Sequence, residues 1–74
     1  SIDRLDEAAL DFDRAAELAT DPGLRASARF NEGNMRFIQG RMADAVVAYE
    51  AALAANPGHG EAMRWLAEAR RNDG

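Results

Sequence analysis

Cysteine and lysine are both missing from this 74-residue chain, and aromatic residues make up only 7% of it. Without cysteine the chain has no disulfide bonds, thiolate metal sites or cysteine nucleophiles. The cellular compartment is not determined by this absence, because proteins of oxidising and of reducing environments can both lack cysteine. All nine basic residues are arginine. This usage favours planar, bidentate contacts, or it reflects a GC-rich genome that favours alanine and arginine.

Long apolar runs are also missing, since no stretch approaches the roughly 20 apolar residues that span a bilayer. We therefore expect no direct membrane insertion by this segment. Few aromatics and abundant alanine favour closely packed helices over a sheet. A chain of this length forms one small domain, whose core gives little net stability unless neighbouring repeats or a partner support it.

Positive charge is scarce in the first part of the chain. Before Pro22, seven acidic residues face Arg4 and Arg14, a net charge of −5, whereas the whole chain carries −4. Nucleic-acid binding depends on clustered positive charge, so we expect no nucleic-acid partner.

Three short segments interrupt the helical pattern. Asp21-Pro22-Gly23 and Asn56-Pro57-Gly58 combine a helix-disfavouring residue with proline and glycine, and Gly40 can adopt the left-handed conformation that closes a helix. The segments between them predict helices over residues 2–19, 24–39, 42–55 and 60–71.

Apolar residues in the predicted helices recur at steps of three and four, which gives each helix one apolar face. The first helix carries Ile2, Leu5, Ala9, Phe12, Ala16 and Ala19 on that face, and the third carries Met42, Ala45, Val46, Tyr49, Ala52 and Leu53. In the last helix we expect Met63, Leu66 and Ala67 to face the stack and Trp65 to lie outside it.

The chain also repeats itself. Leu5, Ala8, Phe12 and Ala15 match Met42, Ala45, Tyr49 and Ala52 at a constant offset, and the Pro-Gly pair recurs. Self-similarity at such a period is typical of helical repeat arrays.

The segment from Ala26 to Pro57 resembles the tetratricopeptide repeat (TPR), a unit of about 34 residues that forms helix, turn and helix. The residues that match the family pattern are Ala28, Phe30, Asn31, Gly33, Asn34, Phe37, Gln39, Gly40, Ala45, Tyr49, Ala52, Leu53 and Pro57. To a lesser degree, residues 29–34 and 49–53 also resemble repeats attached to bacterial von Willebrand A-type membrane proteins.

The resemblance implies an all-α fold, with four antiparallel helices in a right-handed superhelical stack. Residues 1–74 would form a single TPR-like domain. Within it, residues 1–20 would be the second helix of a partial repeat, 26–59 a full repeat, and 60–74 the first helix of a following partial repeat. Residues 23–25 would lengthen the link between repeats, and Gly33 and Ala45 would lie where two helices cross beside Tyr49.

The resemblance also implies a protein-interaction scaffold with a concave surface formed by first helices. Its candidate partner-binding residues are Phe30, Asn34, Phe37, Ile38, Arg64, Glu68 and Arg71. Phe30 and Phe37 would equally serve as packing residues, because the array needs aromatic filling. The partner would be another protein or peptide.

The alternative function is a structural element that completes its own truncated stack as a homo-oligomer. Arrays of this kind usually need about three repeats to bury a continuous core. The candidate interface residues on the end helices are Ile2, Leu5, Phe12, Met63, Trp65 and Leu66.

Charged and polar residues give no catalytic or cofactor-binding pattern, so we predict that the chain is not an enzyme and binds no cofactor or metal. His59 lies in a Pro-Gly-His-Gly turn that predicts a solvated loop residue. Arg29, Glu32 and Arg36 stand where the family has larger apolar residues. They predict either a solvated face or a charged rim for a partner, with Glu32 and Arg36 paired across one helical turn.

Overall fold

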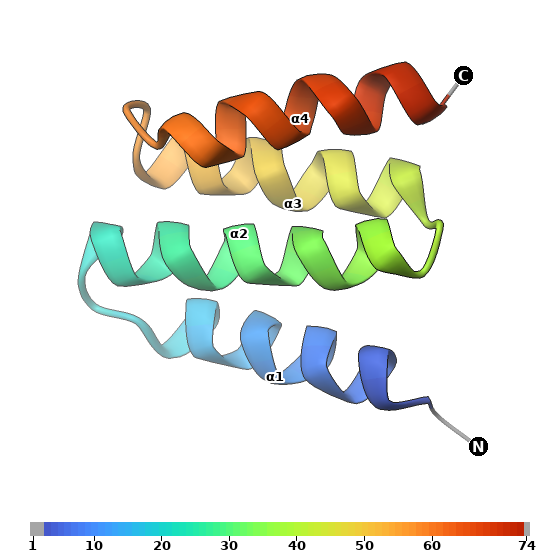
Figure 1. Cartoon of the computed structure of the whole chain (residues 1–74). Coiled ribbons are helices and arrows are strands. Elements are labelled where there is room, and N and C mark those ends of the chain that lie inside the picture. The colour runs from blue at the N-terminus through green and yellow to red at the C-terminus, as the bar shows by residue number, and fades with distance from the viewer. Residues whose placement is uncertain (1–2, 74) are drawn as a thin grey trace.

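The computed structural model describes residues 3–73, and over that range the backbone forms the helices α1 (Arg4–Leu18), α2 (Pro22–Ile38), α3 (Met42–Ala55) and α4 (Gly60–Asp73). Each helix lies antiparallel to the next in chain order, with α1 and α4 on the outside (Figure 1). Packing is sequential, α1 on α2, α2 on α3 and α3 on α4. The all-α prediction is therefore confirmed. Between residues 3 and 73, no helix is long and apolar enough to cross a bilayer.

The start of α2 differs from the prediction by two residues. The Asp21 side chain caps the helix by accepting hydrogen bonds from the backbone N–H groups of Gly23 (2.6 Å) and Leu24 (3.2 Å). Pro22 is the first helical residue, where its fixed φ suits the helix and its missing N–H costs nothing. The expected longer link is therefore wrong, because residues 23–25 form the first turn of α2.

The turn between α2 and α3 follows the prediction. Gly40 has a φ of +77°, the left-handed conformation that residues other than glycine rarely adopt. Its N–H donates to the Phe37 carbonyl and the Arg41 N–H donates to the Arg36 carbonyl, both at 2.9 Å. These bonds satisfy carbonyls at the end of α2 and let α3 begin at Met42.

The core consists mainly of alanine, which lets helix backbones approach closely. Tyr49 on α3 is the largest completely buried side chain in the described part of the chain. Its ring lies against Gly33 on α2 so closely that an added Cβ there would be 2.6 Å from the Tyr49 Cε1 atom. Ala45, one turn earlier, is also fully buried. The predicted close approach of α2 and α3 is confirmed at Gly33 and Tyr49, and Ala45 belongs to the buried cluster around Tyr49.

The buried face of α4 includes Leu66, as predicted, but differs from the prediction at its other positions. Ala62, Leu66 and Ala69 are buried against α3, whereas Met63 is 49% exposed and Ala67 is also exposed. Trp65, expected outside the stack, packs at the edge of the core. Both faces of α4 are suitable for packing, because one carries alanine and the other alanine and methionine. Contact with α3 buries the face that contains Ala62, Leu66 and Ala69.

Candidate functional site

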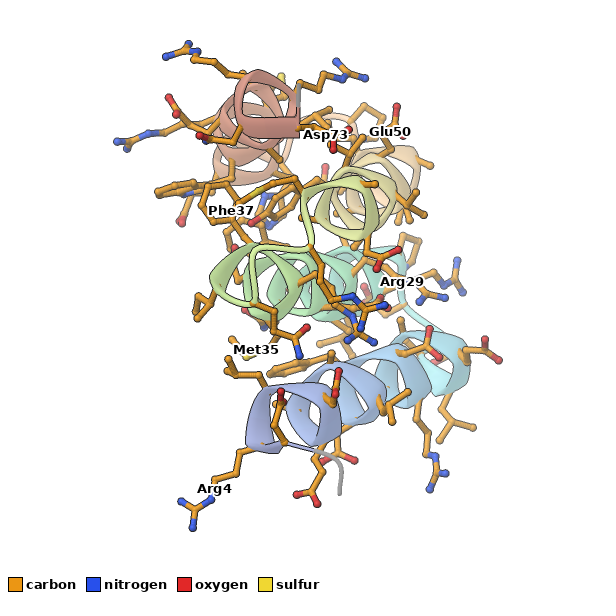
Figure 2. The ribbon with its side chains drawn as sticks, turned by 90° about the vertical axis from the view of Figure 1, so that its right-hand side faces the viewer. Arg4, Arg29, Met35, Phe37, Glu50 and Asp73 are labelled. Carbon is orange, nitrogen blue, oxygen red and sulfur yellow. The ribbon has the colours of Figure 1, made fainter. Side chains whose placement is uncertain are left out.

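A groove of about 500 Å³ runs between α2 and α4, with α3 as its floor. Its lining is mostly apolar and aromatic, and we call it the aromatic groove: Phe30, Asn34, Met35, Phe37, Ile38, Tyr49, Glu61 and Trp65. In the view of Figure 2, Phe37 lies between α2 and α4, beside α3. Helices far apart in the sequence thus contribute to one surface.

The aromatic rings both line the groove and pack against one another. The Phe37 and Trp65 ring centroids are 5.5 Å apart with planes at 81°, the edge-to-face arrangement that aromatic pairs prefer. At the other end, the Phe30 ring is 5.8 Å from the Tyr49 ring and 4.9 Å from the His59 ring. The packing role of Phe30 and Phe37 is therefore confirmed. Each ring is also only partly buried, so part of its surface lies open in the groove.

Asn34 stands between the two phenylalanines on α2 and is held by a single strong contact. The Tyr49 hydroxyl donates a hydrogen bond of 2.6 Å to Asn34 Oδ1. Burial raises the pKa of Tyr49 to about 12, so this hydroxyl stays protonated at neutral pH and remains the donor. With its oxygen bonded to Tyr49, the Asn34 side chain keeps the N–H groups of its amide nitrogen as further hydrogen-bond donors.

Helix α4 carries one charged residue in the groove and several outside it. Glu61 lines the groove directly. The Arg64 guanidinium lies over the Trp65 ring, 5.5 Å from its centroid, in a cation–π contact. Arg71 pairs with Glu68 at 3.5 Å. Of the predicted partner-binding residues, Phe30, Asn34, Phe37 and Ile38 line the groove, while Arg64, Glu68 and Arg71 lie elsewhere on α4.

The predicted interface residues of the end helices do not form one surface. Leu5 and Phe12 are half-buried on α1, Leu66 is buried in the core, and Trp65 lines the aromatic groove. Met63 is half exposed, and Ile2 lies outside the described residues. The sequence did not single out Leu10 and Leu18, which are 51% and 74% exposed on α1.

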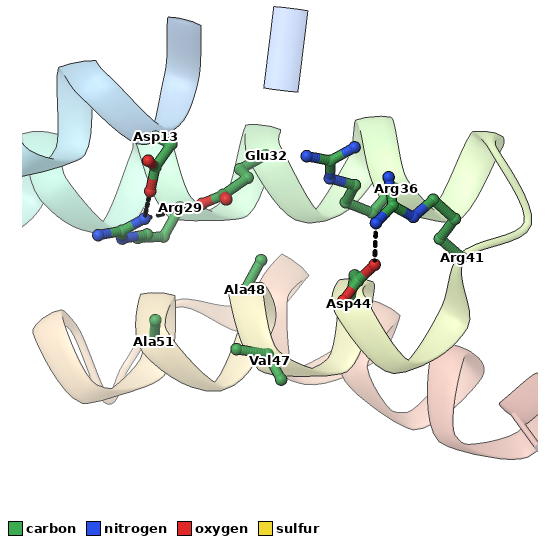
Figure 3. Close-up of a pocket in the computed structure, with 9 residues that line it drawn as sticks. All are labelled: Asp13, Arg29, Glu32, Arg36, Arg41, Asp44, Val47, Ala48 and Ala51. Atoms are coloured by element: carbon green, nitrogen blue, oxygen red, sulfur yellow. Dashed lines mark hydrogen bonds and ion pairs between the residues drawn. The ribbon is translucent and has the colours of Figure 1, made fainter. Parts of the chain in front are cut away.

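A second cavity, of about 400 Å³, lies where α1, α2 and α3 meet and is shown in Figure 3. Charged side chains dominate this charged cleft, which is lined by Asp13, Arg29, Glu32, Arg36, Arg41, Asp44, Val47, Ala48 and Ala51. Arg29 pairs with both Asp13 and Glu32, and Arg41 pairs with Asp44 at 2.7 Å. Its charges are thus neutralised within the chain.

The ion pairs between α1 and α2 form a regular ladder. Arg36 contacts Asp6 at 2.7 Å, and Arg29 contacts Asp13. The two arginines are seven residues apart on α2, and the two aspartates are seven residues apart on α1. Two antiparallel helices bring such pairs into register because seven residues make about two turns. Gln39 adds a hydrogen bond of 2.9 Å from its Nε2 to Asp6.

This ladder corrects both expectations for the charged face of α2. The side chains of Arg29, Glu32 and Arg36 are only 22%, 17% and 14% exposed, so they form neither a solvated face nor a rim. The expected Glu32–Arg36 pair is also wrong, because Glu32 pairs with Arg29 and Arg36 reaches Asp6. The ladder could have been found in the sequence from the matching seven-residue spacings of the aspartates on α1 and the arginines on α2.

The ladder changes the proton affinity of its members. Hydrogen bonds from Gln39 and Arg36, together with the charges of Arg36 and Arg41, lower the pKa of Asp6 against the opposing effect of burial. Burial alone would lower the pKa of Arg29, but hydrogen bonds to Glu32 and Asp13 outweigh it and raise that pKa. Both shifts favour the charged forms that the ion pairs need.

His59 is a helix cap and not a solvated loop residue. Its Nδ1 accepts a hydrogen bond of 3.1 Å from the Ala62 N–H, and its ring packs against Phe30. This contact satisfies one of the free N–H groups at the start of α4. In the described part of the chain, no group of three histidine, aspartate or glutamate side chains is arranged to hold a metal ion.

Comparison of the chain with models of protein families, with curated proteins and with solved structures finds no match. The geometry alone therefore defines the class: a small all-α stack with an aromatic groove on one side of α2 and a self-neutralised cleft on the other.

Proposed function

We propose that this chain is a TPR-like interaction module that binds an extended peptide segment of another protein in the aromatic groove. The observation that carries the proposal is the combination of half-buried aromatic rings with an amide oriented by the Tyr49–Asn34 hydrogen bond. Ligand sites of this kind pair apolar walls with a few placed polar groups. A backbone carbonyl of the peptide would accept from the Asn34 amide nitrogen.

The helix arrangement supports the repeat assignment. Helices α2 and α4 share one side of α3, which matches first helices lining a common surface. Gly33 lies against Tyr49, and Ala45 is buried, at two positions where the TPR pattern has small residues. On this proposal the stack follows a right-handed superhelix, α2 and α3 form the full repeat, and α1 and α4 belong to its neighbours.

Binding is favoured over catalysis because the groove lacks a converging set of titratable groups. Among its described lining residues, only Tyr49 and Glu61 are ionisable. The charged cleft is a weaker candidate for binding, since its arginines already have carboxylate partners and a ligand would have to displace them.

Two exposed aliphatic residues allow a matched test. Ile38 lines the groove and is 64% exposed, while Val47 lines the charged cleft and is 65% exposed. Peptides would be selected from a random display library on the unmodified chain, synthesised, and titrated against Ile38→Asp and Val47→Asp by isothermal calorimetry. We expect Ile38→Asp to weaken binding about tenfold, because it places a charge in an apolar contact, and Val47→Asp to leave it unchanged.

The proposal fails if selection gives no binders, or if both substitutions weaken binding equally. Trp65 supplies an independent signal, because it is the single tryptophan of the chain and lines the groove. A peptide in the groove should shift its fluorescence emission.

Self-association is the second candidate function, favoured by the exposed Leu10 and Leu18 on α1 and Met63 on α4. Burying such side chains is worth about 1.5–3 kcal/mol each. Sedimentation across concentration tests it, comparing the unmodified chain with Leu10→Asp and with Phe12→Asp combined with Trp65→Asp. A stable monomer at high concentration would exclude this candidate, and a dimer that Leu10→Asp dissociates would support it.

A further inference from the structure

We propose that the aromatic groove selects peptides with an apolar anchor and an arginine or lysine two residues away, the cation pairing with Glu61. This inference rests on the proposed function and adds the chemistry of the partner. It follows from the distribution of charge and apolar surface along the groove.

The anchor end is defined by Phe37, Ile38 and Trp65. The two aromatic rings contact each other edge-to-face, and Ile38 beside Phe37 leaves most of its side chain exposed. An aliphatic side chain of a peptide would cover Ile38 and the exposed edges of both rings, removing apolar surface from water.

The charge requirement comes from Glu61. It is the one charged residue among the described lining of the groove at neutral pH, because Tyr49 stays protonated. Within residues 3–73, Glu61 has no ion-pair partner. Several other carboxylates are also without an ion pair, but Glu61 is the one that lines the groove. A ligand cation therefore finds a carboxylate here that the chain itself does not neutralise.

Arg64 fixes where that cation can approach. Its guanidinium lies over Trp65 and would repel a second positive charge at the anchor end. Glu61 precedes Trp65 by four residues on α4, so their Cβ atoms lie about 5–6 Å apart. In an extended peptide, side chains on the same face repeat every second residue, about 6.6 Å along the strand. The matching pattern is an apolar residue and a basic residue separated by one position.

The test uses three pools of nine-residue peptides with leucine at the central position. The two positions that lie two residues before and after the leucine are fixed within each pool, and the remaining positions are drawn from Ala, Ser, Thr and Asn. Both positions two residues from the leucine are Lys in one pool, Glu in the second and Ser in the third, which covers either direction of the peptide. Binding is followed by Trp65 fluorescence at low ionic strength. We expect the Lys pool to bind about fivefold more tightly than the Glu pool, as for an exposed ion pair replaced by a like-charge contact.

Glu61→Gln should reduce the ratio between the Lys and Glu pools to about one. Glu50→Gln, which removes an exposed carboxylate paired with Arg70, is the matched control and should leave the ratio unchanged. If the Glu pool binds as tightly as the Lys pool, the charge preference is wrong while groove binding stands. If no pool shifts Trp65 emission and library selection gives no binders, the proposed function itself fails.

Discussion

Helix α2 uses opposite chemistry on its two sides. Toward α1 it presents Arg29 and Arg36, which meet Asp13 and Asp6 in an ion-pair ladder. Toward α3 and α4 it presents aromatic rings and Gly33, with Tyr49 packed in the gap. The charged groups on the first side are paired inside the chain. The second side leaves part of its apolar surface exposed in the aromatic groove. Ion pairs thus connect α2 to α1, whereas close packing around Tyr49 connects α2 to α3.

The two sides also contribute differently to stability. Partly exposed ion pairs contribute roughly 0–1 kcal/mol each, whereas close packing around a buried ring is sensitive to single methyl groups. We therefore expect α1 to be the helix most easily detached and the α2–α3 crossing to be the most sensitive region.

The largest effect should come from Gly33→Ala. The new Cβ would lie 2.6 Å from Cε1 and 2.7 Å from Cδ1 of the buried Tyr49 ring, so the ring or the helix must move. We expect a loss of about 1–3 kcal/mol in the free energy of unfolding, measured by urea titration with circular dichroism. Gly60→Ala is the control, because an added Cβ there meets nothing within 4 Å. Equal stability of the two variants would show that the crossing is not tight.

The next effect concerns the ladder. Arg29→Met keeps the apolar stem but leaves Asp13 and Glu32 without their partner in a partly buried site. We expect a loss of about 1–2 kcal/mol. Arg70→Met removes a pair whose side chains are 59% and 50% exposed, and it should cost less than about 0.5 kcal/mol. If both substitutions cost the same in urea titrations, the ladder is no more than a surface feature.

A smaller effect is expected at the helix cap beside the groove. His59→Ala removes the acceptor for the Ala62 N–H and should cost about 1 kcal/mol. His59→Asn should retain most of that stability, because asparagine caps helices well. Hydrogen exchange at the start of α4 provides the measurement. Unchanged protection in His59→Ala would mean that water replaces the cap without loss.

The smallest effect concerns protonation of Asp6, which should change the stability of α1 only in acid and not at neutral pH. Its pKa in the folded chain is lowered by Gln39 and Arg36, so its stabilising contribution is complete above its unfolded pKa of about 3.9. That contribution is lost as the pH falls through the lowered native pKa. Hydrogen exchange should therefore show α1 loosening before Trp65 fluorescence reports a change in the groove. Asp6→Asn should weaken this pH dependence. If α1 loses its exchange protection at the same pH at which Trp65 fluorescence changes, α1 does not detach separately from the rest of the chain.

Local sequence signals determined the helices of the described residues and placed their bounds to within two residues. Gly40 ended α2 as expected and α3 spans the predicted residues, because a left-handed glycine and a proline turn act within a few residues of chain. The close approach at Gly33 was also predictable, since small residues opposite a large ring leave few other packings.

Only the tertiary structure decided where the charges and the last helix face. Arg29 and Arg36 are polar by composition, but their aspartate partners on α1 lie 16 and 30 residues away, so no local rule could place them. Leu66 was predicted for the core, but its neighbours on α4 were undetermined because alanine fits both a core and a surface. Packing on α3 buries Ala62 and Ala69 and leaves Ala67 exposed. The aromatic groove likewise exists only because α3 holds α2 and α4 side by side, so that residues from both helices line one surface.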